Sequence, residues 1–420
     1  MNNYKIGLCG LKNIGNTCFM NSILQLFLNS EAFITFMLKN NEKAECDEYI
    51  DRVIANKLGE IERKRNNIPE HVKIKITNEN IKKYRKTTLM MKLSEYISIV
   101  YNKGNSQIVP EEFKNILEMV FNKFKGNRQH DAHELLIELL DKFIDESGIQ
   151  SEPQINNVPE SITDYINLKK TISEKIKKSD TTDVEKKKLI KYFDEYKSQH
   201  KADVTKFLGV MYIINLFKNK YNPLIYKMQI ILSTEIDCSN CNNVSTKFEN
   251  TTVLSLELKP NDDGIITLDS CLNNFCAPEK IEDYICDCCK KKGFANKKTK
   301  IFRYPFLFFI HLKRFKNISY GKTSKDESLI HLTNTLNISK FVDSTMFTND
   351  SYKPTYKLKG IVNHFGGMGG GHYTADCCSL IDEKWYNFDD SSVSKYHGMN
   401  SNFENYNSSK PYILMFENNN

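Results

Sequence analysis

Cys18 stands where a polar turn meets an apolar segment, a position that can activate a thiol. Gly15, Asn16 and Thr17 precede it, and apolar side chains then recur at three- and four-residue intervals as far as Phe27, a spacing typical of a helix. We expect the Thr17 hydroxyl to cap this helix. A thiol in the first turn is biased toward thiolate, the nucleophilic form, by the helix dipole and the free N–H groups. A buried structural cysteine is the competing interpretation.

A cysteine nucleophile needs a base, and two histidines stand in the segment IVNHFGGMGGGHYTADC. His372 follows a glycine run that includes Gly370 and Gly371, and glycines beside a catalytic residue allow close backbone approach and loop movement. The pattern favours His372 as the base and leaves His364 as the alternative. A phosphate cradle is a weaker explanation of the glycines, because no GK[ST] helix start follows them.

Two adjacent carboxylates follow the histidine in the segment KWYNFDDSSVS. Asp389 lies 17 residues after His372 (389 − 372), at the end of a strand-like run, and Asp390 is its neighbour. A carboxylate there could hold the tautomer of the imidazole, which completes the nucleophile, base and orienting group of a catalytic triad. The alternative is a turn or a helix cap, both common for Asp before Ser-Ser.

Four other cysteines have the spacing of metal ligands. They form two CxxC pairs, Cys238 with Cys241 and Cys286 with Cys289, with 44 residues between the pairs (286 − 241 − 1). Two such pairs can close a tetrahedral site, so they predict one structural Zn²⁺. Cys288 could replace Cys289, whereas Cys271 and Cys276 are interpreted as apolar filler. A redox role is disfavoured, because neither pair opens a helix in a βαβ unit.

The elements that would position these groups change in type along the chain. Amphipathic helical periods dominate the N-terminal part, and alternating or β-branched runs such as QIILSTEI and PYILMF dominate from about residue 226. Helices followed by strands predict an α+β fold. The charged segments 41–88 and 149–205 are interpreted as insertions.

The composition describes a soluble globular chain. It has 420 residues, 40% hydrophobic and 26% charged, with a net charge of +7, and we interpret its lysines as solvated helix faces rather than a nucleic-acid surface. No apolar run has the length of a membrane helix, and no secretory signal is apparent. Twelve cysteines without such a signal predict an intracellular protein, cytoplasmic or nuclear and not secreted.

Several motifs together resemble the ubiquitin-specific proteases, a papain-like family of deubiquitinating cysteine proteases. GLKNIGNTCFMNSILQ resembles the Cys box, NHFGGMGGGHYTAD with KWYNFDDSSVS the His box, and RQHDAHELL the glutamine box. IHLKRF resembles the strand before the active-site loops, and the CxxC pairs match the zinc site of the family's fingers. These motifs run in order from about residue 10 to residue 416.

The resemblance implies a papain-like right hand with a helical thumb, a β palm and zinc-binding β fingers. It implies a single catalytic domain over residues 1–420, with the thumb at about 8–205 including both insertions, the fingers at about 226–300, and the palm at about 206–225 and 301–418. The histidine follows the cysteine by 354 residues (372 − 18), far more than the ~130–150 of papain. The fingers and insertions account for that difference.

The resemblance also implies roles for individual residues. Cys18 matches the nucleophile, His372 the general base and Asp389 the orienting residue, a role that Asp390 could share or assume. Asn13 matches the side chain that stabilises the oxyanion, together with the amide of Cys18.

Six further residues are expected to contact the substrate. They are Gln129, Asp131, Glu134, His364, Gly370 and Gly371. Asp131 and Glu134 resemble the acidic residues that meet the arginines of the ubiquitin tail, although a solvated helix face would have the same sequence. Gly370 and Gly371 resemble the flexible loop that admits the diglycine end.

The predicted function is hydrolysis of the isopeptide or peptide bond after the C-terminal glycine of ubiquitin. The expected partners are ubiquitin and ubiquitinated proteins, without nucleic acid or membrane, and the chain is expected to be a monomer. One structural Zn²⁺ and no organic cofactor are expected. The alternatives are a catalytically inactive ubiquitin-binding scaffold and a protease for another ubiquitin-like modifier.

Overall fold

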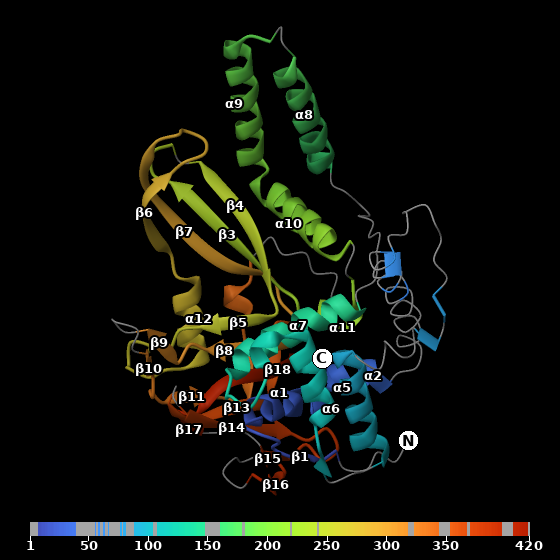
Figure 1. Ribbon diagram of the computed structural model, residues 1–420. Coiled ribbons are helices and arrows are strands. Elements are labelled where there is room, and N and C mark those ends of the chain that lie inside the picture. Colours follow the sequence, from blue (N-terminus) through green and yellow to red (C-terminus); the bar gives the residue numbers. More distant parts are fainter. Residues whose placement is uncertain are drawn as a thin grey trace.

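The structure of the protein is a computed structural model. It describes isolated positions between 55 and 80 and the ranges 7–38, 88–103, 107–147, 160–178, 181–218, 221–241, 243–317, 323–343, 353–367, 370–396 and 406–418. The expected insertion at 41–88 lies almost wholly outside these residues. Helices and two larger sheets make up the body, and two long helices project from it (Figure 1).

The helical part corresponds to the expected thumb. Its helices are α1 (Cys18–Leu28), α2 (Glu31–Leu38), α5 (Leu89–Ser98), α6 (Glu111–Val120) and α7 (Ala132–Ser147), with a π-helix η1 (Ile99–Lys103) and a 3-10 turn η2 (Asn122–Phe124). All 11 residues of α1 are buried, because α7 and α5 cover one side of it and palm strands cover the other. Phe27 stacks on Phe33 with ring centroids 4.4 Å apart. Burying a side chain of this size contributes about 1.5–3 kcal/mol, so α1 is a rigid platform for its first residue, Cys18.

The palm is an eight-stranded sheet. In spatial order its strands are β16 (Ser392–Lys395), β15 (Trp385–Asp389), β14 (Gly370–Cys378), β13 (Thr355–Gly367), β18 (Pro411–Asn418), β8 (Leu307–Leu312) and β5 (Val253–Leu256), and β12 (Thr335–Asn337) also pairs with β13. Alternate residues of its central strands face two different cores: Val362 and Met415 pack with the thumb, whereas Ile361 and Leu414 pack on the opposite face. Burial on both faces explains why these strands read as continuous apolar runs.

The fingers are a four-stranded antiparallel sheet. Its order is β4 (Val244–Thr251), β3 (Ile230–Cys238), β7 (Lys292–Arg303) and β6 (Glu279–Ile285). Its base joins the second core, where α12 (Leu268–Cys276) packs beside β7. The strand ends farthest from the palm carry the four cysteines of the CxxC pairs.

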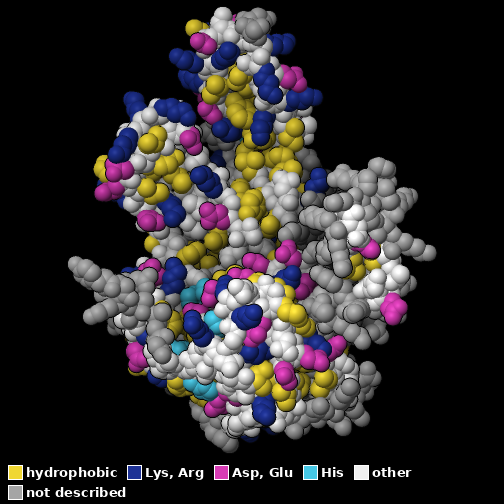
Figure 2. All heavy atoms as spheres, in the orientation of Figure 1, with side chains coloured by type: hydrophobic (Ala, Val, Ile, Leu, Met, Phe, Trp, Pro, Cys, Tyr) yellow, Lys and Arg dark blue, Asp and Glu magenta, His cyan; other side chains and the backbone are white. Residues whose placement is uncertain are grey.

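The expected insertion at 149–205 is helical where it is described. It forms α8 (Glu160–Lys177), α9 (Asp183–Gln199) and the start of α10 (Lys201–Phe217), and α8 and α9 project from the body (Figure 1). Basic and acidic side chains are interspersed over this projection (Figure 2), which fits solvated helix faces. The expected boundary at residue 205 falls inside α10, whose Tyr212 donates a hydrogen bond to Asn250 of β4 (2.8 Å).

Short elements complete the described chain. They are α11 (Pro223–Met228), η3 (Ser339–Phe341), β1 (Gly10–Leu11) paired with β2 (Gln107–Ile108), β9 (Phe315–Asn317) paired with β10 (Thr323–Lys325), and β11 (Ile330–Leu332) paired with β17 (Tyr406–Ser408). Among the described helices, none combines the length and hydropathy that a bilayer crossing requires. The order of elements, mostly helices first and strands later, is that of the predicted α+β class.

Candidate active site and cysteine cluster

Cys18 is the first residue of α1, as predicted, but the expected cap is different. Thr17 occupies the N-cap position without capping the helix through its side chain. Its hydroxyl instead accepts the N–H of Ile14 at 3.1 Å and lies 3.4 Å from the Asn13 side-chain oxygen. The hydroxyl therefore stabilises the turn before the helix, because polar groups of that turn compete with the helix N–H groups for it.

The thiol of Cys18 is less acidic than its place at the helix start predicts. The side chain is 1% exposed, and burial raises the pKa of Cys18 above its ordinary value. The backbone N–H of Tyr373 lowers this pKa, and the carboxylate of Asp390 raises it. Desolvation is the largest of these effects, so the expected bias toward thiolate is outweighed here.

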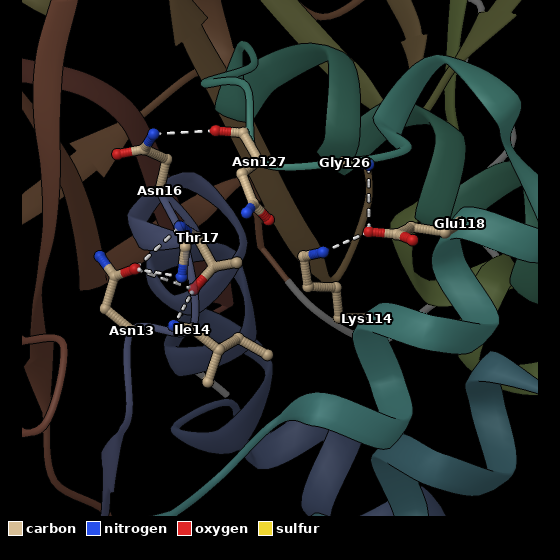
Figure 3. A network of polar contacts seen from close by, with 9 residues as sticks. Asn13, Ile14, Asn16, Thr17, Lys114, Glu118, Gly126 and Asn127 are labelled. Atoms are coloured by element: carbon tan, nitrogen blue, oxygen red, sulfur yellow. Dashed lines mark hydrogen bonds and ion pairs between the residues drawn. The ribbon is translucent and has the colours of Figure 1, made fainter.

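Asn13 lies in the turn before Cys18, and both ends of its amide are held; Figure 3 shows the contacts of the oxygen end. Its oxygen accepts the N–H groups of Gly15 and Thr17, each at 3.1 Å. Its nitrogen donates to Asp390 at 2.8 Å. The amide is thus fixed beside the helix start, where its N–H₂ is the group that could face an oxyanion.

His372 and Asp389 form the pair that the sequence predicts. His372 is in the first part of β14 and Asp389 is the last residue of β15, and His372 Nε2 lies 2.6 Å from Asp389 Oδ1. β14 and β15 are adjacent in the sheet, which brings the two side chains together. In the described part of the chain no hydrogen bond joins His372 to Cys18. The next residue, Tyr373, does reach the thiol through its backbone N–H.

Asp390 belongs to the same cluster but has different partners. Its backbone φ of +50° turns the chain just after β15. Its two carboxylate oxygens accept the side-chain amides of Asn13 and Asn21, each at 2.8 Å. A ring nitrogen of His372 and one carboxylate oxygen each of Asp389 and Asp390 lie within 4.8 Å of one another. The adjacent aspartates therefore hold different groups: Asp389 holds the imidazole, and Asp390 holds the thumb.

His364 is packed into the interior rather than paired with a carboxylate. It is 3% exposed, and its ring contacts those of Phe315, Tyr373 and Tyr412. Burial lowers the pKa of His364 to about 4, which keeps the ring neutral at physiological pH. Among the two candidate bases, only His372 has an acidic partner within hydrogen-bonding distance in the described residues.

Gln129 joins the thumb to the start of β14. Its side-chain N–H₂ donates to the carbonyl of Gly371 at 2.5 Å, and its oxygen accepts the N–H of Gly371 at 2.9 Å. Gly371 also lies against His364 on the adjacent strand, because a Cβ there would be 2.3 Å from the Nε2 of His364. Gly370, by contrast, has open space where its side chain would be.

The two acidic residues before and in α7 already have internal partners. Asp131 accepts the N–H of His133 at 2.7 Å and the hydroxyl of Tyr412 at 2.7 Å. Glu134, in the first turn of α7, forms an ion pair with Lys123 at 2.7 Å. A basic substrate segment would therefore have to displace these internal partners in order to bind the two carboxylates.

The four cysteines of the two CxxC pairs converge at the end of the fingers. The sulfur atoms of Cys238, Cys241, Cys286 and Cys289 all lie within 4.8 Å of one another, with 3.7 Å between Cys241 and Cys286 and 4.0 Å between Cys238 and Cys289. Tetrahedral Zn–S bonds of about 2.3 Å require sulfur separations of ~3.8 Å, so the donor set fits such an ion. Backbone N–H groups of Cys289 and Cys288 lower the pKa of Cys286 to about 7. The Cys288 side chain is exposed, outside the cluster.

Sequence reasoning missed a buried carboxyl behind the histidine. Asp376 lies four residues after His372 on β14, is 2% exposed, and accepts the side-chain amides of Asn363 (2.6 Å) and Asn387 (2.7 Å). Burial raises the pKa of Asp376 to about 6. A carboxyl within the predicted strand HYTADC was the available signal. Asn21 was missed as well, although a polar residue three positions after Cys18 shares its helix face.

A helix-borne thiol lies beside two adjacent strands that carry a histidine and its carboxylate partner, an arrangement typical of papain-like cysteine hydrolases. Residues 9–416 match the ubiquitin carboxyl-terminal hydrolase family, and the chain belongs to that family. The resemblance of the motifs and the predicted enzyme class, a cysteine-type deubiquitinase, are thereby confirmed.

Relatives from distant sources are similar over most of the chain. A probable ubiquitin carboxyl-terminal hydrolase of Acanthamoeba polyphaga mimivirus is 26% identical over 411 residues, which cover 93% of this chain and 86% of the viral protein. Ubiquitin carboxyl-terminal hydrolase 2 of Bos taurus is 28% identical over 398 residues, 92% of this chain and 52% of the bovine protein. The chain thus spans about half the length of that relative.

Solved structures share the fold. The SAGA DUB module of Ubp8, Sgf11, Sus1 and Sgf73 bound to monoubiquitin has a TM-score of 0.61 and 20% identity, with 99% of this chain and 70% of that chain covered. The same module bound to ubiquitin aldehyde also has a TM-score of 0.61 and 20% identity, covering 100% and 71%. The predicted α+β class with thumb, palm and fingers is confirmed.

Proposed function

We propose that this chain is a thiol-dependent hydrolase that cleaves the bond after the C-terminal glycine of ubiquitin through Cys18, His372 and Asp389. The observation that carries the proposal is the 2.6 Å contact between His372 Nε2 and Asp389, on strands that pack against the helix of Cys18. A carboxylate on Nε2 leaves the other ring nitrogen free to exchange a proton with the thiol.

The proposed reaction has two steps. The sulfur of Cys18 bonds to the carbonyl carbon of the terminal glycine while its proton passes to His372, and His372 then gives a proton to the departing lysine amine. Water next attacks the thioester and passes a proton to His372, which returns it to the Cys18 sulfur as the ubiquitin carboxylate leaves. Asn13 and the Cys18 amide are the proposed donors to the oxyanion.

The geometry implies what must change when substrate binds. The pKa of Cys18 is raised by burial, so the proton must leave through His372 rather than to water. The amide of Asn13 donates to Asp390, and part of this contact must be exchanged for an oxyanion.

The tail-binding residues keep their proposed roles. Asp131 and Glu134 are proposed to meet basic side chains of the tail, in exchange for the internal contacts that each now makes. Gly370 and Gly371, with Gln129 and His364 around them, are proposed to form the narrow part of the channel. Neighbouring structures that contain ubiquitin support ubiquitin as the partner.

The cysteine cluster is proposed to hold one structural Zn²⁺ through Cys238, Cys241, Cys286 and Cys289. Its four donors leave no coordination position for substrate, so the ion would stabilise the end of the fingers and supply no chemistry. None of the described cysteines forms a disulfide, which supports the proposed reducing location, cytoplasmic or nuclear. The chain is proposed to act as a monomer, with no organic cofactor.

Two other functions share much of this geometry. An inactive ubiquitin-binding scaffold would keep the fingers and acidic residues, but it would not need the His372–Asp389 contact. A protease for another ubiquitin-like modifier would keep the whole site and differ only in the partner.

Labelling with ubiquitin that carries a C-terminal electrophile tests all three. We expect a covalent adduct with the wild type and none with Cys18→Ser, and we expect equivalent probes from other modifiers to react more slowly. Absence of any adduct would support the scaffold, and preference for another probe would identify another modifier.

A further inference from the structure

Near the thiol of Cys18, one edge of β14 has no described strand paired with it. β15 pairs with β14 only from Ala375 to Cys378, so the segment from Gly371 to Tyr373 has no strand on that side among the described residues. The N–H of Tyr373 on this edge reaches the thiol of Cys18. Gly371 lies two residues earlier, so its N–H and C=O point to the same side, about 7 Å along the strand.

Gln129 occupies this edge as a strand would. Its carboxamide donates to the carbonyl of Gly371 and accepts the N–H of the same residue, at 2.5 and 2.9 Å. Exchange of both hydrogen bonds with one residue is the pattern of an antiparallel β-pair. A peptide unit of an extended chain has the same donor and acceptor, so Gln129 and an extended substrate compete for Gly371.

The contact also joins the thumb to the palm. Gln129 belongs to the loop before α7, and its partner lies 242 residues away in the sequence. The strand paired with it, β13, is held within the palm, because the Lys325 ammonium group donates to the carbonyls of His364 (2.8 Å) and Gly366 (3.1 Å). Release of Gln129 therefore frees the N–H and C=O of Gly371 without breaking the hydrogen bonds of Lys325 to β13.

We propose that Gln129 determines specificity by holding the main-chain hydrogen bonds of Gly371 until the extended tail of a folded ubiquitin displaces it. This inference rests on the proposed function. A short tail peptide must displace Gln129 with its few contacts alone, whereas a folded modifier supplies additional surface on the same molecule. At concentrations that saturate the enzyme only with the folded modifier, Gln129 thus favours substrates whose tail is attached to a folded body.

Two electrophilic probes of different size test this role. One is full-length ubiquitin and the other is a five-residue peptide of its tail, each with the same C-terminal electrophile, and the rate constant of labelling is measured for both. We expect Gln129→Ala to react with the peptide roughly 3- to 30-fold faster than the wild type, as expected for loss of one or two partly exposed hydrogen bonds. At a concentration that saturates the wild type with ubiquitin but not with the peptide, bound ubiquitin has already displaced Gln129. The ubiquitin probe should then gain less, so the ubiquitin-to-peptide ratio of labelling rates should fall.

The control is Gln199→Ala, which removes the same side chain from an exposed position on α9 and should leave both rates unchanged. Slower labelling of Gln129→Ala by both probes would mean that Gln129 holds the substrate rather than the closed state, and would overturn the proposal. An unchanged probe ratio would overturn it too. A wild type that does not react with ubiquitin would instead overturn the proposed function.

Discussion

Gly371→Ala should disturb the alignment of His372 while leaving the rest of the fold intact. A Cβ at this position would lie 2.3 Å from the Nε2 of His364 and 2.7 Å from the carbonyl oxygen of Phe365. Ordinary contacts begin at 3.4 Å, so the imidazole must retreat by about 1.1 Å (3.4 − 2.3). His364 is enclosed by three aromatic rings, and the Phe365 carbonyl belongs to a paired strand. Neither group can move that far alone, so β14 is expected to shift.

The size of the effect follows from what β14 carries. Overpacking of a filled site costs about 1–3 kcal/mol of folding free energy, which leaves a chain of this size folded. The displaced residue is directly before His372, however, and a misplacement of about 1 Å at a catalytic group can lower the rate ~100-fold. We therefore expect a large loss of activity with a small loss of stability.

The matched control is Gly367→Ala, because its added Cβ meets no atom within 4 Å. The rate of labelling by the ubiquitin electrophile and the urea midpoint are measured for both variants. Gly371→Ala should label about 100-fold more slowly than Gly367→Ala, with urea midpoints that differ modestly. Equal labelling rates would refute the reasoning, because the clash would then be relieved without moving His372.

Three further perturbations address other parts of the molecule. Cys286→Ser should reduce zinc below one ion per chain and destabilise the fingers, whereas Cys288→Ser, outside the cluster, should retain the ion; elemental analysis measures both. Asp389→Asn should lower the turnover number by up to ~10⁴-fold, and more than Asp390→Asn does, because only Asp389 contacts the imidazole; equal losses would contradict this division. Burial raises the pKa of Asp376 from 3.8 to about 6, so its protonated form stabilises the fold below pH 3.8 and this contribution is lost as the pH rises through 6. Relative to Asp376→Asn, the wild type should lose about 3 kcal/mol over that range ([6 − 3.8] × 1.36), and parallel pH profiles of the two proteins in denaturant titrations would disprove it.

The predictable part of the site is the part that local patterns specify. The apolar period after Cys18 predicts α1, and the CxxC spacing predicts which four sulfur atoms converge. The strand-like runs around His372 and Asp389 predict that both residues lie on strands, as they do. The helix, the strands and each CxxC pair are patterns of residues within about ten positions of one another, where periodicity and spacing carry the information.

The remaining features depend on contacts between distant segments. The hydroxyl of Thr17 has two possible partners, the helix N–H groups and the turn before them, and only the position of Asn13 decides for the turn. The acidity of Cys18 depends on how deeply palm strands bury it, which no local pattern records. The pairing of Gln129 with Gly371 spans 242 residues, so the sequence could predict a contact with substrate but not this internal partner.

Because Asp389 and Asp390 are adjacent, the sequence alone could not decide which of them orients the imidazole of His372. Successive side chains of a strand point to opposite faces, so an extended chain would send Asp389 and Asp390 apart. The strand ends at Asp389, and the φ of +50° at Asp390 rotates the next side chain back toward the same cluster. Asp389 then meets the imidazole, while Asp390 accepts amides from Asn13 and from Asn21 of α1. One left-handed residue thus ties the proposed oxyanion donor and the helix of the nucleophile to the strand that orients the base. The relative position of thumb and palm at this point is therefore set by hydrogen bonds as well as by the apolar core beneath them.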